Sequence, residues 1–124
     1  MATLVIVGAQ WGDEAKGKMA DYFAADAHMV VRYAGGNNAG HTVIVGDKVF
    51  KFQLLPAGII HPHMVSVLGG GMVIDPIGLL DELDRTHEIQ PETGRLAISS
   101  AAHVVLPYHR LLDALEEDAR GHNK

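Results

Sequence analysis

Hydrophobic and polar residues follow one another in blocks along this chain, and the apolar blocks are of two kinds. Some are short, continuous and rich in β-branched residues, which is typical of strands buried inside a sheet. Others have a helical composition or place apolar residues at helical spacing. We expect strands or short extended segments at residues 3–7, 29–33, 42–45, 48–52, 65–68, 72–74, 95–99 and 103–106. We expect helices at residues 16–25, 77–87 and 107–120.

Turn and capping residues mark several of these boundaries. Gly46-Asp47 lies between two apolar runs and predicts a two-residue hairpin turn. Pro76 and Pro107 stand where helices are expected to begin, a position that tolerates proline, and Asp75 would cap the first of these helices. On one side of the last helix lie leucines that we expect to pack in the core: Leu111, Leu112 and Leu115.

The order of these elements predicts the fold class. Strands that alternate with helices favour an α/β fold with a mainly parallel sheet. The fold would begin with a strand–loop–helix unit like that of phosphate-binding loops and would carry an antiparallel hairpin insertion near residue 46. The chain has 124 residues, enough for one hydrophobic core, and no internal repeat or linker divides it. We therefore expect residues 1–124 to form a single domain.

Composition narrows the possible partners. Fifteen acidic and ten basic residues give a formal net charge of −5, which argues against nucleic acid or an anionic membrane as a partner. The chain has no cysteine, so a disulfide framework and thiolate catalysis are excluded. We find no basic segment before the first apolar run and no stretch long enough to cross a bilayer. These features predict a cytoplasmic protein.

Residues 8–18, GAQWGDEAKGK, form the first motif with clear chemistry. Gly12, Gly17 and Lys18 match the phosphate-binding pattern G-x-x-x-x-G-K, in which a glycine-rich loop opens a helix. Met19 occupies the position where a Ser or Thr normally binds Mg²⁺. The carboxylate of Asp13 is then the natural metal ligand. The alternative interpretation is that the glycines only turn the chain from strand to helix.

Residues 35–42, GGNNAGHT, form the second motif. They follow another predicted buried strand, and their glycines would let a ligand approach the backbone closely. His41 can give or take a proton near neutral pH. A single histidine is more often structural than catalytic, but the ends of parallel strands meet at one edge of a sheet. His41 is therefore a candidate to share a site with the first motif.

Other polar residues suggest weaker candidate sites. His61 and His63 resemble a metal-binding pair, but no third ligand is evident, and a loop is the favoured interpretation. His109 and Arg110 either contact an anion or only pack around the last helix. Neither pair adds a site of comparable specificity to the two glycine-rich motifs.

Taken in order, the stretches GAQWGDEAKGK, RYAGGNNAGHTV, FQLLPAGI, GGGMVIDP and SSAAHVVLPYHRLLD resemble the N-terminal part of the adenylosuccinate synthetase family. The resemblance covers essentially the whole chain, whereas family members are several times longer. It implies GTP-dependent ligation of IMP and L-aspartate to adenylosuccinate, in the synthesis of AMP, through 6-phosphoryl-IMP. It also implies Mg²⁺, with GTP, IMP and L-aspartate as ligands, and a homodimer.

The resemblance assigns roles to residues of both motifs. Asp13 would be the general base that takes the N1 proton of IMP, and it would also ligate Mg²⁺ together with the backbone carbonyl of Gly40. His41 would be the general acid. The residues implied in GTP binding are Gly12, Asp13, Glu14, Ala15, Lys16, Gly17, Lys18, Gly40, His41 and Thr42. The residues implied in IMP binding are Asp13, Glu14, Ala15, Lys16, Asn38, Ala39, Gly40 and His41.

The chain departs from the family pattern in two ways. Ala15 stands where the family loop typically has a glycine, and a positive φ there would make alanine unfavourable by about 1–2 kcal/mol. The family's guanine- and aspartate-binding segments lie beyond the part that this chain resembles. One hypothesis is therefore the N-terminal part of an active synthetase. The other is a truncated, non-catalytic module for nucleotide or phosphate binding or for assembly. Residues 37–42 disfavour an unrelated phosphate-loop kinase.

Overall fold

A computed structural model describes residues 2–9, 15–38 and 40–120 of the chain. Along the sequence the elements are α1 (Lys16–Ala24), β1 (Met29–Gly35), β2 (His41–Val45), β3 (Lys48–Phe52), the 3-10 helix η1 (Ala57–Ile60), β4 (Val65–Ile74), α2 (Pro76–Ile89), β5 (Arg95–Ile98), β6 (His103–Val104) and α3 (Pro107–Arg120). This order of strands and helices confirms the predicted α/β class.

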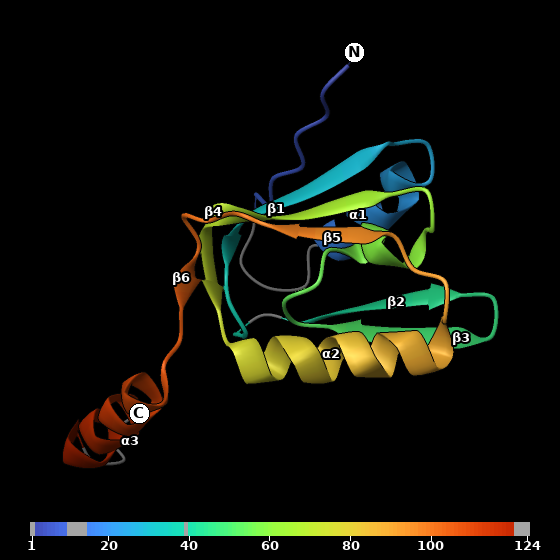
Figure 1. Cartoon of the computed structure of the whole chain (residues 1–124). Coiled ribbons are helices and arrows are strands. Elements are labelled where there is room, and N and C mark those ends of the chain that lie inside the picture. Colours follow the sequence, from blue (N-terminus) through green and yellow to red (C-terminus); the bar gives the residue numbers. More distant parts are fainter. Residues whose placement is uncertain (1, 10–14, 39, 121–124) are drawn as a thin grey trace.

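The main sheet is parallel, as predicted, and β4 lies at its centre (Figure 1). The strand β1 pairs with β4 from Val65 as far as Met72, β5 pairs with residues 65–68 on the other side, and β6 pairs with the end of β4. The two runs predicted at residues 65–68 and 72–74 belong to this one long strand, because its three glycines continue the extended chain. Gly71 also admits β1 closely, since a Cβ atom there would lie 2.6 Å from the carbonyl oxygen of Tyr33.

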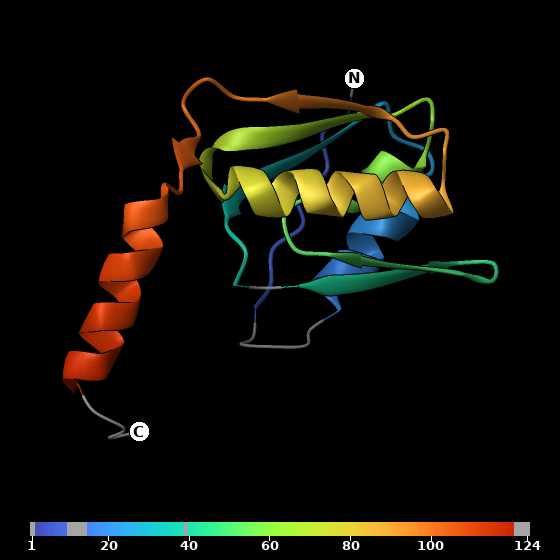
Figure 2. The same ribbon diagram turned by 60° about the horizontal axis from the view of Figure 1, so that its bottom comes forward.

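The predicted hairpin is confirmed. Strands β2 and β3 pair antiparallel, and Gly46 in the turn has a φ of +58°, a backbone conformation that glycine adopts readily. The hairpin and α2 lie on the same side of the main sheet (Figures 1 and 2). Their apolar side chains enclose the core, whose largest fully buried members include Phe52, Leu54, Leu55, Ile59, Leu68 and Met72.

The strand predicted at residues 3–7 is wrong for this structure. Residues 2–8 form no strand, and Leu4, Val5 and Val7 are 61%, 71% and 69% exposed. A continuous apolar run becomes a buried strand only when neighbouring strands and covering layers are available. Among the described residues no strand pairs with this segment, and Figure 1 shows it leading away from the sheet. Of the predicted strand–loop–helix unit, the structure confirms the helix.

The core packing predicted for the last helix is also wrong. Helix α3 begins at Pro107 and ends at Arg120 as predicted, but none of its residues is buried. It projects from the body of the molecule (Figures 1 and 2), and its large apolar side chains are substantially exposed. The leucines predicted to be core are therefore each more than half exposed: Leu111, Leu112 and Leu115. Among the described residues, no helix is long and apolar enough to span a membrane.

Candidate functional site

The second half of the first motif lies at the start of α1. Lys16, Gly17 and Lys18 form the first turn of this helix, and the dipole of a helix favours an anion at its N-terminal end. Ala15 precedes the helix with φ 63° and ψ 21°, the left-handed conformation, and within the described part of the chain it is the one non-glycine residue with a positive φ. The other predicted residues of this motif, Gly12, Asp13 and Glu14, lie outside the described residues.

The start of α1 lies directly against the second motif. A Cβ atom built on Gly17 would lie 2.8 Å from the Cβ of His41 and 3.0 Å from its Cδ2. Such distances leave no room for a side chain, so Gly17 permits the close approach of helix and histidine. The structure thus brings residues of the two glycine-rich motifs together at Gly17 and His41, through helix α1 and strand β2. Asn38, Gly40 and Thr42 lie beside His41 in the chain, whereas Ala39 is outside the described residues.

His41 opens β2 with its ring packed against Phe52 at a centroid distance of 5.5 Å. Its Nε2 atom is buried and has no hydrogen-bond partner among the described residues. Burial lowers the pKa of His41 below its usual 6.5, and the positive charge of Arg32 lowers it further, against smaller opposing effects of Glu82 and Asp21. A neutral imidazole with an unpartnered nitrogen is suited to hydrogen-bond a ligand.

A cleft of about 290 Å³ opens beside His41. Its cationic groups are Lys51 and Arg85. Its other lining residues are Gly40, His41, Thr42, Phe52 and Gln53. The backbone of the second motif, two cations and a partly buried imidazole thus surround one space, which suits an anionic ligand.

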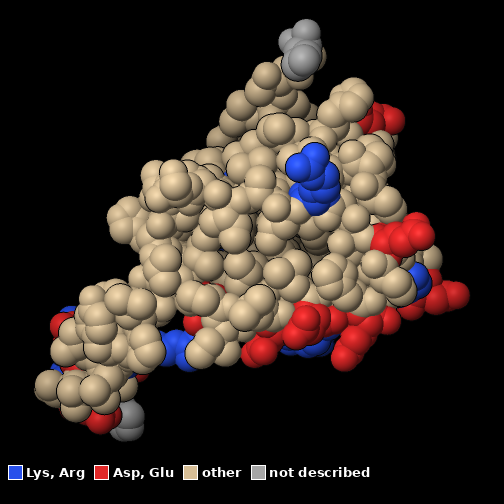
Figure 3. Space-filling model, in the orientation of Figure 1, with Lys and Arg blue, Asp and Glu red and all other residues tan. Residues whose placement is uncertain are grey.

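A second cleft, of about 550 Å³, shares Gln53 and Arg85 with the first. It has a different electrostatic character, because Asp75, Asp81 and Asp84 line it alongside Arg85 and Arg110. Figure 3 shows Asp and Glu side chains gathered along the edge formed by α2. Phosphate groups would be repelled from this edge, so the cleft beside His41 is the better candidate for them.

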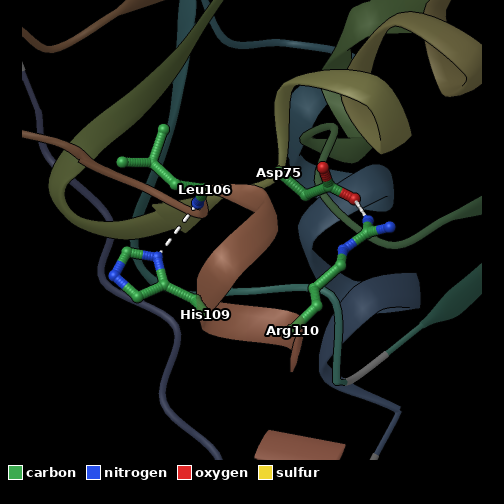
Figure 4. Close-up of polar contacts among 4 residues, drawn as sticks. All are labelled: Asp75, Leu106, His109 and Arg110. Atoms are coloured by element: carbon green, nitrogen blue, oxygen red, sulfur yellow. Dashed lines mark hydrogen bonds and ion pairs between the residues drawn. The ribbon is translucent and has the colours of Figure 1, made fainter. Parts of the chain in front are cut away.

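Asp75 precedes α2 at the N-cap position, as predicted, but its side chain makes no capping hydrogen bond. Its buried carboxylate instead accepts a hydrogen bond from the guanidinium of Arg110 on α3 (Figure 4). Gly78 leaves room beside it, since a Cβ atom there would lie 2.9 Å from Asp75 Oδ2 and 3.0 Å from Asn37 Nδ2. Arg110 thus contacts an anionic group of the chain itself.

His109 has a local role at the start of α3. Its Nδ1 accepts a hydrogen bond of 3.0 Å from the backbone N–H of Leu106 (Figure 4). The third residue of the helix thereby satisfies a donor just before the helix, as in a capping box. Of the two alternatives for His109, packing at the last helix agrees with this contact.

The histidines of residues 61–63 lie in a turn after η1, as the loop interpretation predicted. His61 Nε2 lies 3.6 Å from Asp21 Oδ1 on α1, and its ring centroid lies 5.9 Å from that of His63. Within residues 2–9, 15–38 and 40–120 no group of three or more metal-binding side chains is present.

Two charged residues near the site, one buried and one partly buried, were missed by sequence reasoning. Glu82 on α2 is 2% exposed, and its carboxylate accepts hydrogen bonds from the backbone N–H groups of Gln53, Leu54 and Leu55 at 2.8, 2.9 and 3.1 Å. Arg32 on β1 donates to the carbonyl oxygens of Gln53 and Gly36. The one available signal was a charged residue within a predominantly apolar strand or helix face.

The family model for adenylosuccinate synthetase matches residues 5–124, nearly the whole chain. The chain belongs to the adenylosuccinate synthetase family. It is 54% identical over all 124 residues to the adenylosuccinate synthetase of Desulforamulus reducens, and it spans 29% of the length of that relative.

Two solved structures are similar to this member of the adenylosuccinate synthetase family. The fully ligated adenylosuccinate synthetase from Plasmodium falciparum matches with a TM-score of 0.78 and 38% identity, over 91% of this chain and 26% of that one. The succinoaminodeoxyadenylate synthetase of cyanophage S-2L, bound to dGMP and dATP as an energy donor, matches with a TM-score of 0.66 and 35% identity, over 86% of this chain and 30% of that one. Both similarities support the α/β architecture described above.

Proposed function

We propose that residues 1–124 form the GTP- and IMP-binding N-terminal portion of an adenylosuccinate synthetase. The whole reaction would be the GTP-dependent ligation of IMP and L-aspartate to adenylosuccinate. Family membership supports this proposal, and one observation carries it to the site: Gly17 admits His41 against the start of α1. That contact supports a role for His41 as a proton donor beside a phosphate-binding helix terminus.

The chemistry requires a poor leaving group to be activated. Transfer of the γ-phosphate of GTP to the purine O6 gives 6-phosphoryl-IMP, from which the amine of L-aspartate displaces phosphate. In this proposal Asp13 takes the N1 proton of IMP. His41 acts as the acid by placing its N–H against the charge that develops during transfer, which a neutral imidazole can do. Its lowered pKa and its unpartnered Nε2 support that role.

The nucleotide contacts proposed from the described residues lie at one end of α1 and the adjoining β2. Lys16 and Lys18 would add positive charge to the helix N-terminus that binds the GTP phosphates, and the backbone of residues 40–42 would complete this surface. Ala15, Lys16, Asn38, Gly40 and His41 would face IMP. For Gly12, Asp13, Glu14 and Ala39, the proposed contacts rest on the family resemblance.

Mg²⁺ is proposed to bind between Asp13 and the carbonyl of Gly40. A carboxylate and a backbone carbonyl are the oxygen ligands that this ion prefers. Gly40 is exposed and lines the cleft beside His41, which leaves space for an ion there. When bound, Mg²⁺ would neutralise charge on the phosphate oxygens. A homodimer and a cytoplasmic location complete the proposal.

The experiment measures binding of GTP with Mg²⁺, and of IMP, to the chain by calorimetry, with dATP and dGMP as competing ligands. His41→Gln should weaken GTP binding about tenfold, the equivalent of about one hydrogen bond to a charged group. His63→Gln is the matched control, because His63 is exposed in a turn outside the site, and it should bind like the original chain.

The outcomes separate the hypotheses. Binding followed by adenylosuccinate formation on addition of L-aspartate supports a competent synthetase. Binding without turnover supports the non-catalytic nucleotide-binding module. A chain that binds neither GTP nor IMP, although folded, would contradict the proposed function, and stronger binding of dATP and dGMP would redirect it to those substrates.

A further inference from the structure

Arg32 connects two segments of backbone that are distant in sequence. Its guanidinium donates to the carbonyl of Gly36 at 3.2 Å through Nη2 and to the carbonyl of Gln53 through Nη1. Gly36 precedes the asparagines of the second motif, and Gln53 directly follows the hairpin. One side chain therefore holds both ends of the segment 36–53, which includes Gly40, His41 and Thr42.

Glu82, on α2, also contacts the backbone of Gln53. Its buried carboxylate accepts the N–H of Gln53 while Arg32 takes the carbonyl of the same residue. Two further N–H groups, of Leu54 and Leu55, also donate to this carboxylate. The negative charge of Glu82 also favours the charged form of Arg32, and so opposes the effect of burial, which lowers the pKa of Arg32.

Gln53, which Arg32 and Glu82 both contact, directly follows Phe52, the residue that pairs with His41. Phe52 pairs with His41 in the β2–β3 register, and the two rings are in contact. A shift of Gln53 would move Phe52, and with it His41, relative to Gly17 on α1. The separation of Gly17 from His41 is therefore set from the base of the hairpin as well as from α1.

We propose that Arg32, supported by Glu82, is a positioning residue that fixes both ends of segment 36–53 and thereby holds His41 against α1. Its importance for catalysis rests on the proposed function, but the positioning itself does not. Arginine suits this role because its planar guanidinium offers several donors in a fixed geometry. Lysine has one ammonium group at a single point, so it can keep the charge but bridges two separated carbonyls less well.

The test compares Arg32→Met and Arg32→Lys with Arg95→Met in the ligand-free chain. Arg95 is the matched control, since it is an exposed arginine on β5, which flanks β4 on the side opposite β1. Backbone amide hydrogen exchange is followed by NMR at residues 41–43 and 53–55, with residues 65–68 of β4 as the reference.

Arg32→Met should accelerate exchange at residues 41–43 and 53–55 about tenfold relative to β4, because hydrogen bonds at the base of the hairpin are lost. Arg32→Lys, which keeps the aliphatic stem and the charge and so protects the fold, should give a smaller acceleration at the same residues. Arg95→Met should change neither group. A purely structural role would accelerate exchange equally in the hairpin and in β4.

Equal acceleration in both groups, or no change at residues 41–43 in either Arg32 variant, would overturn the proposal. Titration with GTP and IMP then separates it from the proposed function. If the local effect is present but the chain binds neither nucleotide, positioning stands and the proposed function fails. If binding is strong and Arg32→Met leaves both exchange and affinity unchanged, positioning fails and the function stands.

Discussion

Ala15→Gly should stabilise the chain, although glycine usually destabilises. Ala15 has φ 63° and ψ 21°, where a Cβ atom is unfavourable by about 1–2 kcal/mol, and glycine removes that term. Glycine also gives the unfolded chain more freedom, which offsets about 0.4–1 kcal/mol. The net expectation is a gain of about 0.5–1 kcal/mol in the free energy of unfolding, on the order of a two- to fivefold change in the folding equilibrium constant.

Urea denaturation measures this change as a shift of the transition midpoint. With a slope of about 1–3 kcal/mol per molar urea, the midpoint should rise by about 0.2–1 M while the slope stays constant. Ala25→Gly is the matched control, because Ala25 is the C-cap residue of the same helix and has φ −53° and ψ −35°, an ordinary helical conformation. Glycine there gives the unfolded chain more freedom and relieves no strain, so it should lower the free energy of unfolding by about 0.4–1 kcal/mol.

The prediction is that glycine raises the free energy of unfolding at residue 15 and lowers it at residue 25. If Ala15→Gly destabilises the chain as much as Ala25→Gly does, then residue 15 does not adopt the left-handed conformation in solution. Ala15→Gly should also bind GTP and IMP more tightly than the original chain, since the methyl group of Ala15 precedes the first turn of α1, where the phosphates are proposed to bind. Equal GTP and IMP affinity for both versions would show that this methyl group does not affect binding.

Three further predictions concern other parts of the fold. Because the pKa of His41 is lowered in the folded state, the chain should lose stability as pH falls below 6.5, and this loss should be complete below the folded pKa. Urea midpoints measured from pH 7 to pH 5 should therefore fall less in His41→Gln than in the original chain. Glu82→Gln should lower stability by about 1–3 kcal/mol, since the amide leaves backbone N–H groups poorly satisfied; a thermal melt with unchanged midpoint would contradict this. Leu68→Ala should lower the free energy of unfolding by about 2–5 kcal/mol, whereas Leu111→Ala should change it by no more than about 0.5 kcal/mol. If chemical denaturation gives comparable losses for both variants, α3 packs on the core.

Much of the backbone could be predicted because local signals are strong where turns and strands meet. The hairpin turn at Gly46-Asp47, the helix starts at Pro76 and Pro107, and the parallel pairing all follow from residue chemistry and element order. Hydrophobic pattern alone could not say what covers an apolar face. The run at residues 3–7 and the leucines of α3 therefore have the expected pattern but are exposed among the described residues.

The site was predicted in part for a related reason. Glycine-rich motifs after apolar runs pointed to Gly17 and His41, which the structure brings together. Arg32 and Glu82 escaped prediction because their partners are backbone atoms rather than side chains. Gln53, which both of them contact, lies 21 residues from Arg32 and 29 from Glu82, so folding alone reveals the arrangement.

Substitutions of the glycines in the middle of β4 should affect the site, although these glycines lie away from it. A Cβ atom on Gly69 would lie 3.0 Å from the Cα of Tyr33, and one on Gly71 would meet the carbonyl oxygen of the same residue. Tyr33 follows Arg32 directly, so an alanine at either glycine would push β1 away and draw the guanidinium from its carbonyls. In a mutational scan, these alanine substitutions would impair the site without contacting it. The two positions would be mistaken for ligand-binding residues unless the structure of the hairpin in each variant were measured as well.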